Sequence, residues 1–202
     1  GLNRYREADS LSIVKIGLCG HGYWGQNLFR TFSSDPRFEV VAVSDIRESA
    51  RERVRRTSGT IQLYGDGTEV IDDPEVEAVA IATPAATHFS LARRALVRNK
   101  HVLVEKPMCA SVVEAKELVT LAEANGVTLM VDHTYLFHGA VGKLRQLHQN
   151  GSLGAVSYYD SLRVNLGLFQ PDLNVLWDLG PHDFSIMDYL FDEDPLHVEA
   201  TG

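Results

Sequence analysis

The chain has 202 residues, more than one ordinary domain needs and fewer than two large domains need. Its net charge of −8 argues against nucleic-acid binding, which rests on a basic surface. No apolar run approaches the ~18 residues of a membrane span, and Cys19 and Cys109 have no disulfide or metal-ligand spacing, so we expect a cytoplasmic protein with no metal, nucleic-acid or membrane partner.

A glycine-rich loop follows the first apolar segment. Residues 1–11 are expected to be a flexible N-terminus or tag remnant, and residues 13–18 a buried strand that leads into Gly20-His21-Gly22-Tyr23-Trp24-Gly25 at the start of a helix. Gly20 allows the tight turn, Gly22 lets the backbone approach a pyrophosphate, and Gly25 permits close helix–strand packing. The pattern predicts a dinucleotide site that includes Tyr23 and Trp24. The alternative is a glycine-rich loop that binds no nucleotide.

An acidic residue follows the second predicted strand, residues 38–43. Asp45 lies twenty positions after Gly25, where a ribose-binding carboxylate is expected. Such a carboxylate accepts from the ribose 2′-OH and repels a 2′-phosphate, so the cofactor is expected to be NAD rather than NADP. Arg47 is the residue that could overturn this preference. The basic run 47–56 contains Glu48 and Glu52 and is interpreted as a solvated helix face.

Strands and helices then alternate with short connections, the pattern of βαβ units on a parallel sheet. Strands are predicted at 61–64, 77–82, 101–104 and 127–131, with helices at about 87–98 and 111–125. Ser111 and Glu114 match a capping box that opens the second of these helices, and Gly126 matches its stop. The predicted fold class is α/β: a doubly wound, Rossmann-type dinucleotide-binding domain over residues 12–131.

The remaining residues, 132–202, are expected to form a partial, truncated α/β substrate and oligomerisation domain. Helices are predicted at 138–150 and 181–190, a strand with alternating exposure at 155–164, and the start of another strand at 196–200. A long loop, 165–178, separates the middle elements, and long structured loops are often functional.

Three further motifs identify a family resemblance. They are Thr83-Pro84 followed by His88, Glu105-Lys106-Pro107 after a strand, and Asp178-x-x-x-His182. Together with the glycine loop they resemble the Gfo/Idh/MocA oxidoreductases, relatives of glucose-fructose oxidoreductase and inositol dehydrogenase, from about residue 13 to the end. The resemblance implies an NAD-dependent dehydrogenase of a sugar or nucleotide-sugar hydroxyl, a cis Pro107 and a homo-oligomer. It also implies a longer chain than this one.

The site residues follow from the chemistry of alcohol oxidation, which needs a hydride acceptor, a base and a cation near the developing alkoxide. Lys106, at a strand end, is expected to supply the positive charge, and His182 to transfer the proton. Asp178 would hydrogen-bond the imidazole ring or the substrate, or simply cap a helix. Further cofactor contacts are expected from Thr83, Pro84, His88 and Glu105, and substrate contacts from Tyr135, Arg163, Asn165 and Asn174.

Several alternatives stay open at this point. Lys106 alone could be a surface lysine beside a turn, and the polar residues around the long loop could simply organise that loop. Within the enzymes, the alternative is an inositol or polyol dehydrogenase or a keto-reductase. Outside them, it is an NAD(H)-binding regulator or a truncated pseudoenzyme. A partial second domain is also expected to expose apolar surface and to self-associate.

Overall fold

The computed structural model describes residues 12–164, 174–191 and 193–201. The chain divides into two compact units, Gly1–Val131 and Asp132–Gly202. The expected flexible segment 1–11 and the candidate substrate residue Asn165 both lie outside the described residues. No described helix is long and apolar enough to cross a lipid bilayer.

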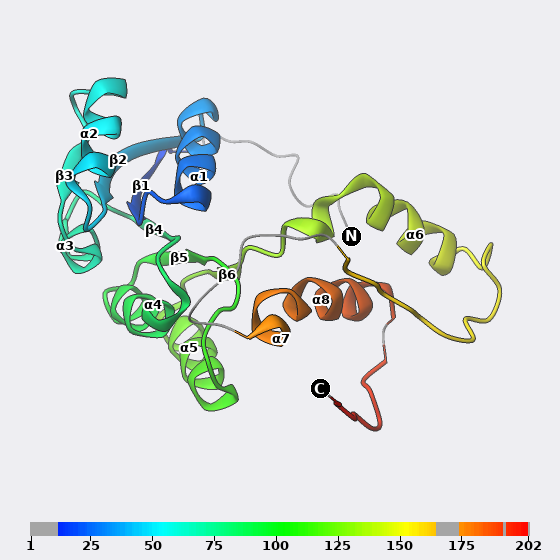
Figure 1. Ribbon diagram of the computed structural model, residues 1–202. Helices are drawn as coiled ribbons and strands as arrows, with labels where there is room; N and C mark the ends of the chain where they lie inside the picture. The colour runs from blue at the N-terminus through cyan, green and yellow to red at the C-terminus, as the bar shows by residue number, and fades with distance from the viewer. Residues whose placement is uncertain (1–11, 165–173, 192, 202) are drawn as a thin grey trace. The chain divides into compact units, whose positions relative to one another are not determined.

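The first unit is built on a parallel sheet of six strands in the order β3-β2-β1-β4-β5-β6 (Figure 1). These strands are β1 (Val14–Cys19), β2 (Phe38–Ser44), β3 (Gln62–Tyr64), β4 (Ala78–Ile81), β5 (His101–Val104) and β6 (Leu129–Val131). All six predicted strands form, and every pair is parallel. The strand order reverses between β1 and β4, which is where open α/β sheets bind ligands beyond their carboxyl ends. The predicted Rossmann fold is thus confirmed.

Side chains that alternate along each strand build two cores, one on each face of the sheet. Along β4, Val79 and Ile81 belong to one core and Ala80 to the other. The same strands are buried on both faces, as expected for a parallel sheet with helices on either side. Position 17 is glycine because a Cβ there would lie 2.4 Å from Val70 Cγ1, so no side chain fits.

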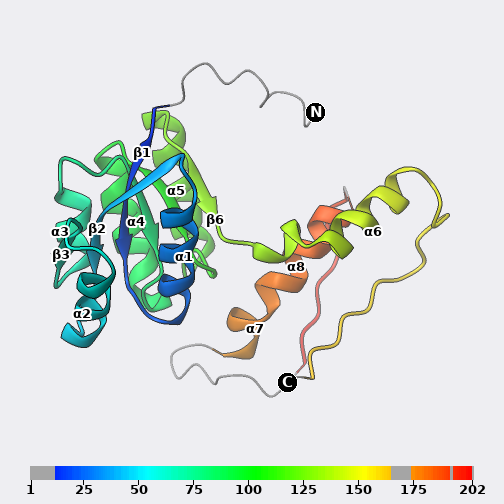
Figure 2. The same cartoon turned by 90° about the horizontal axis from the view of Figure 1, so that it is seen from above.

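Five α-helices cover these two faces (Figure 2). Phe29 of α1 (Tyr23–Ser34) and Val54 of α2 (Glu48–Thr57) enter one core. The other core takes side chains from three helices: α3 (Gly67–Asp72), α4 (His88–Val97) and α5 (Val112–Asn125). A short 3-10 turn, η1 (Ala85–Thr87), leads into α4. The predicted solvated face on α2 is confirmed by ion pairs that join Arg51 and Arg55 to glutamates one turn earlier.

Local capping explains where two of these helices begin and end. Ser111 Oγ accepts from Glu114 N at 3.3 Å, as predicted, but the Glu114 carboxylate accepts from Ala110 N rather than from Ser111 N. Gly126 ends α5 in the left-handed region at φ 64°. The sequence reasoning missed α3, although Asp66 and Glu69 form a complete capping box at its start. Six residues are too few for a helical period to stand out.

The second unit contains helices and extended chain. Its elements are η2 (Thr134–Phe137), α6 (Gly139–Gln149), α7 (Val175–Asp178) and α8 (Gly180–Leu190). The two predicted helices correspond to α6 and α8. The single turn α7 falls inside the predicted loop.

The two strands predicted in this unit are wrong. Residues 155–164 and 196–200 form no strand in the structure, and Ala155 and Leu196 lie in bends. A strand is defined by backbone hydrogen bonds to a neighbour, and neither segment has such a partner among the described residues. Alternation of side chains predicted strands but could not supply a pairing partner.

Candidate functional site

The three positions of the fingerprint loop are glycine for different physical reasons. Gly20 has φ 90°, and a Cβ there would lie 2.7 Å from the Ala82 carbonyl oxygen. At Gly25 a Cβ would lie 2.1 Å from the Gly20 carbonyl oxygen, so only glycine permits the loop to fold onto α1. Gly22 is different, because its nearest neighbour would be Arg47 Nη2 at 3.7 Å. The side of the loop at Gly22 is therefore open to a ligand.

Helix α1 begins beside this opening. Its N-cap is Gly22, which offers no side-chain oxygen to the first-turn N–H groups. A helix N-terminus with uncapped N–H groups and space beside it is suited to a pyrophosphate. Tyr23 and Trp24 are exposed on the first turn, with ring centroids 5.3 Å apart in an edge-to-face arrangement. The loop thus fits the pyrophosphate of a dinucleotide.

Asp45, directly after β2, is buried and heavily hydrogen-bonded. Its Oδ2 accepts from His21 N and from Arg47 Nη2, each at 2.9 Å. Its Oδ1 accepts from Arg47 N and Nε, also at 2.9 Å. Burial alone would raise the pKa of this carboxyl, but the Arg47 and His21 hydrogen bonds lower it to about 2. The carboxylate lies where the sequence predicts it, and it is hydrogen-bonded to the Arg47 guanidinium.

Because of this lowered pKa, part of the free energy of unfolding should be lost in acid. Since the folded-state pKa is about 2 and the ordinary value is 3.8, the stabilisation is present above about pH 4 and is lost as the pH falls towards 2. The shift corresponds to about 2 kcal/mol of unfolding free energy. Asp45→Asn should therefore flatten the pH dependence of urea unfolding between about pH 4 and pH 2.

Asp35 provides the control for that measurement. Its pKa is also lowered to about 2 by Arg37, but its pair is exposed to solvent. Asp35→Asn should change the pH dependence little, because exposed ion pairs contribute little to stability. Equal flattening by both variants would contradict the role given to burial at Asp45.

The loops after β4 and β5 are joined by a buried histidine. His88 is 1% exposed, and its Nδ1 and Nε2 lie 2.7 Å from Pro107 O and 2.8 Å from Thr83 O. Thr87 Oγ1 donates to Thr83 Oγ1 at 2.7 Å, while Pro84 is exposed. In this conformation His88 orders the two loops and offers a ligand no surface of its own. The exposed candidate for cofactor contact here is Pro84.

The Glu105-Lys106-Pro107 segment lies at the carboxyl end of β5. The Lys106–Pro107 peptide bond is cis, as the resemblance implies. Glu105 is buried, and its backbone N donates to Ile81 O at 2.9 Å, so the loop continues the pairing with β4. Lys106 is partly exposed at the strand end. The carboxyl ends of β1, β2, β4 and β5 thus carry all the cofactor residues predicted in this unit.

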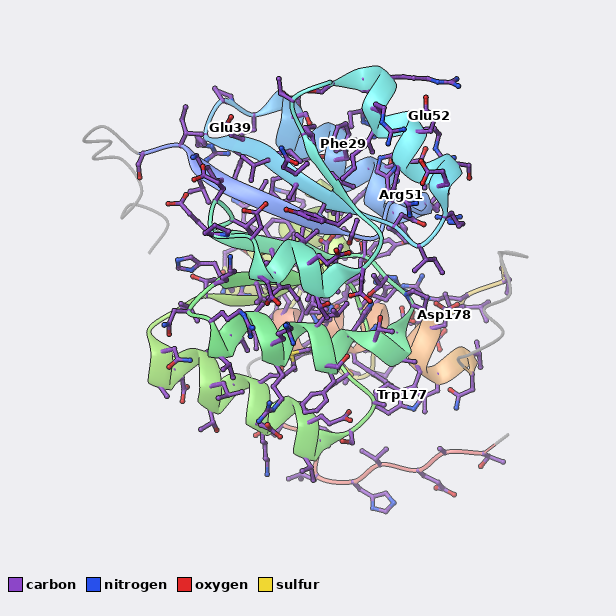
Figure 3. All side chains as sticks on the ribbon, turned by 90° about the vertical axis from the view of Figure 1, so that its left-hand side faces the viewer. Phe29, Glu39, Arg51, Glu52, Trp177 and Asp178 are labelled. Atoms are coloured by element: carbon purple, nitrogen blue, oxygen red, sulfur yellow. The ribbon has the colours of Figure 1, made fainter. Side chains whose placement is uncertain are left out.

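In the second unit, His182 lies in the first turn of α8. It is 8% exposed, and its ring meets the Tyr135 ring edge-on at 4.8 Å between centroids. Asp178 is the last residue of α7, labelled in Figure 3. The N-cap residue of α8 is Leu179, which makes no side-chain capping hydrogen bond. The structure brings Tyr135 and His182 together, two of the predicted site residues.

Arg163 has a partner that the sequence reasoning missed. Its Nε donates to Asp183 Oδ2 at 2.7 Å, and Asp183 Oδ1 accepts from Ser161 Oγ at 2.7 Å. The guanidinium also lies over the Tyr135 ring at 5.2 Å. Burial raises the pKa of the Asp183 carboxyl, but these hydrogen bonds lower it more. Asp183 directly follows His182, and that adjacency was the available signal.

Two other expectations concern loop organisation and metals. Asn174 Oδ1 accepts from Trp177 N at 3.1 Å, so Asn174 caps α7, which fits the reading of a loop-organising residue. Among the residues placed in the structure, no group of three or more His, Cys, Asp and Glu side chains is arranged to hold a metal ion.

Comparison with known proteins agrees with this architecture. The family model of the Gfo/Idh/MocA oxidoreductases, with an NAD-binding Rossmann fold, matches residues 14–133. The UDP-N-acetylglucosamine 3-dehydrogenase of Acidithiobacillus ferrooxidans is 35% identical over 94% of this chain and 58% of its own length. The scyllo-inositol 2-dehydrogenase (NADP(+)) of Bacillus subtilis is 27% identical over 90% of this chain and 52% of its own length.

A solved structure from Magnetospirillum magnetotacticum MS-1 has a TM-score of 0.78 at 33% identity, covering 92% of this chain and 59% of that one. The chain therefore spans between half and three fifths of the length of these relatives. Since the family model covers more than half of the chain and agrees with the sheet order and the glycine loop, the chain belongs to the Gfo/Idh/MocA oxidoreductase family.

Proposed function

We propose that this chain is the cofactor-binding part, and a portion of the substrate-binding part, of an NAD-dependent dehydrogenase that oxidises a secondary hydroxyl of a sugar or nucleotide-sugar. The observation that carries the proposal is the pairing of an open glycine loop at Gly22 with a buried carboxylate at Asp45. A relative named UDP-N-acetylglucosamine 3-dehydrogenase supports the substrate class.

The residue roles follow from the charge that develops on the substrate oxygen. A nicotinamide cofactor held at the Gly22 loop would supply the hydride acceptor. Lys106 would stabilise the alkoxide with its positive charge, and His182 would accept the hydroxyl proton. Asp178 would orient the imidazole or the substrate. Tyr135 packs on the His182 ring and would hold it in place. Arg163 would contact the substrate while its Nε still donates to Asp183.

Substrate assays decide among the alternatives. Turnover should be measured with NAD on UDP-sugars, free sugars, inositols and the matching ketones. An inositol preference would favour the polyol dehydrogenase, for which the relative named scyllo-inositol 2-dehydrogenase gives support. NADH binding without turnover on any substrate would favour the non-enzymatic alternative, an NAD(H)-binding regulator or pseudoenzyme.

The cofactor preference depends on two side chains. We expect NADH to bind more tightly than NADPH, because the Asp45 carboxylate can accept from a ribose hydroxyl. Asp45→Ala should weaken NADH by about 10-fold to 100-fold, the range for a hydrogen bond to a charged group. Arg47→Ala should widen the preference for NADH, since it removes the cation nearest to the carboxylate. Fluorescence titration with both cofactors measures this, and tighter NADPH binding by the wild type would overturn it.

Assembly and location complete the proposal. The second unit exposes several large apolar side chains, and exposed apolar surface favours association. They include Tyr158, Leu162, Val164, Val175 and Phe184. We therefore expect a homo-oligomer, and light scattering that finds a stable monomer would contradict it. The lack of disulfide spacing between Cys19 and Cys109 is the basis for expecting a cytoplasmic location.

A further inference from the structure

A cleft of about 570 Å³ opens between α1 and α2 in the first unit. Arg30 and Ser33 line it from α1, and Arg53 and Arg56 line it from α2. Phe29, labelled on α1 in Figure 3, packs edge-on against the His21 ring at 5.4 Å, and both rings line the same cleft. Volumes of this size hold small molecules.

Two of its three guanidinium groups have no carboxylate partner among the described contacts. Arg30 Nη2 donates to Asn27 Oδ1 at 3.1 Å. Arg53 donates only to backbone carbonyls, at 3.3 Å to Ser49 O and 3.4 Å to His21 O. Elsewhere on α2, Arg51 and Arg55 are paired with glutamates. The Arg30 and Arg53 guanidinium groups thus give the cleft a positive charge that no described carboxylate neutralises, on a chain whose net charge is −8.

The second observation is a buried imidazole nitrogen that lacks a hydrogen-bond partner among the described residues. His21 is 5% exposed, and its Nδ1 has no hydrogen-bond partner among the described residues. A buried polar atom left unsatisfied is unfavourable, and a water or an ion bound beside it would supply the missing partner. His21 also connects the cleft to the glycine loop, since its N donates to Asp45 and its carbonyl accepts from Arg53.

We propose that this cleft is an anion site for a small phosphomonoester, separate from the dinucleotide site. Guanidinium groups bind phosphate oxygens through paired, charge-assisted hydrogen bonds, and the Ser33 hydroxyl adds a neutral donor. The His21 imidazole and the Phe29 ring form a less polar part of the cleft beside the phosphate. None of the fingerprint glycines, nor Asp45, is among the lining residues.

The test is a titration of the full chain with inorganic phosphate and with glucose 6-phosphate, followed by calorimetry and by amide chemical shifts. Glucose is the uncharged control. We expect both phosphates to bind and to shift amides of α1 and α2, including those of Phe29 and Arg53. The double variant Arg30→Gln/Arg53→Gln should weaken binding at least about 10-fold, because each lost contact is charge-assisted.

A second double variant, Arg37→Gln/Arg55→Gln, removes the same charge from two arginines that do not line the cleft. It should change the affinity less than about twofold. Equal weakening by both double variants would mean that only net charge matters, and that would overturn the proposal. Displacement of the phosphate by one equivalent of NADH or NADPH would also overturn the proposal. It would show that the phosphate binds at the glycine loop or at a site for the 2′-phosphate of NADPH. If the wild-type chain bound phosphate but did not bind NADH, the proposed cofactor function would be refuted and the anion site would stand.

Discussion

In the full-length protein, and on the proton-transfer role proposed for it, replacing His182 with alanine should lower kcat by about 10²-fold to 10⁴-fold, the usual contribution of a general acid–base group. The residue is buried in the first turn of α8, and its ring packs edge-on against the Tyr135 ring. The affinity for NADH should stay within a few-fold, because His182 belongs to the second unit and the glycine loop belongs to the first. Steady-state kinetics over a range of pH would also lose the limb that reports the base.

Two further variants make this result interpretable. His148 is partly buried and also meets an aromatic ring edge-on, that of Phe191 at 5.5 Å, so His148→Ala controls for loss of packing in the same unit. It should leave kcat nearly unchanged. Lys106→Ala should also lower kcat, by removing the cation rather than the base. Near-normal turnover in His182→Ala together with none in Lys106→Ala would reverse the two roles.

Apart from the short α3, the elements of the nucleotide unit could be predicted from the sequence because their signals are local. A buried strand, a glycine loop and a helix follow one another within residues 13–34, and each has a short-range cause. Gly20 has a positive φ, and Gly25 has no room for a Cβ. Ser111 and Gly126 cap the two ends of α5. Six strands separated by crossovers then allow few topologies other than a parallel doubly wound sheet.

The parts that sequence reasoning missed depend on contacts between distant residues. Pairing of Arg163 with Asp183 joins positions twenty apart, and no periodic pattern announces it. Residues 155–164 alternate like a strand, but a strand exists only where a neighbour completes its hydrogen bonds. Arg47 could be named as a threat to the NAD preference, yet its three hydrogen bonds to the buried Asp45, beside a fourth from His21 N, become visible only in the three-dimensional structure.

Gly25→Ala should destabilise the nucleotide unit by about 3 kcal/mol or more, the upper part of the range for overpacking a rigid site. The added Cβ would lie 2.1 Å from the Gly20 carbonyl oxygen and 2.9 Å from its carbonyl carbon. Both are backbone atoms, which cannot rotate away as a flexible side chain would. Urea unfolding followed by circular dichroism should therefore show a lower midpoint, with weaker NADH binding as a consequence of the distorted loop.

Gly22→Ala separates folding from cofactor binding at the same loop. Gly22 has φ −78°, which alanine adopts readily, and its added Cβ would meet only Arg47 Nη2 at 3.7 Å. Stability should therefore change by less than about 1 kcal/mol, as for a surface substitution without strain. Affinity for NADH should nevertheless fall by about 10-fold or more, because the methyl group would occupy the place where a pyrophosphate approaches the helix N-terminus. If Gly22→Ala binds NADH as the wild type does, the opening beside Gly22 does not receive the pyrophosphate, and the cofactor site must be sought elsewhere in the first unit.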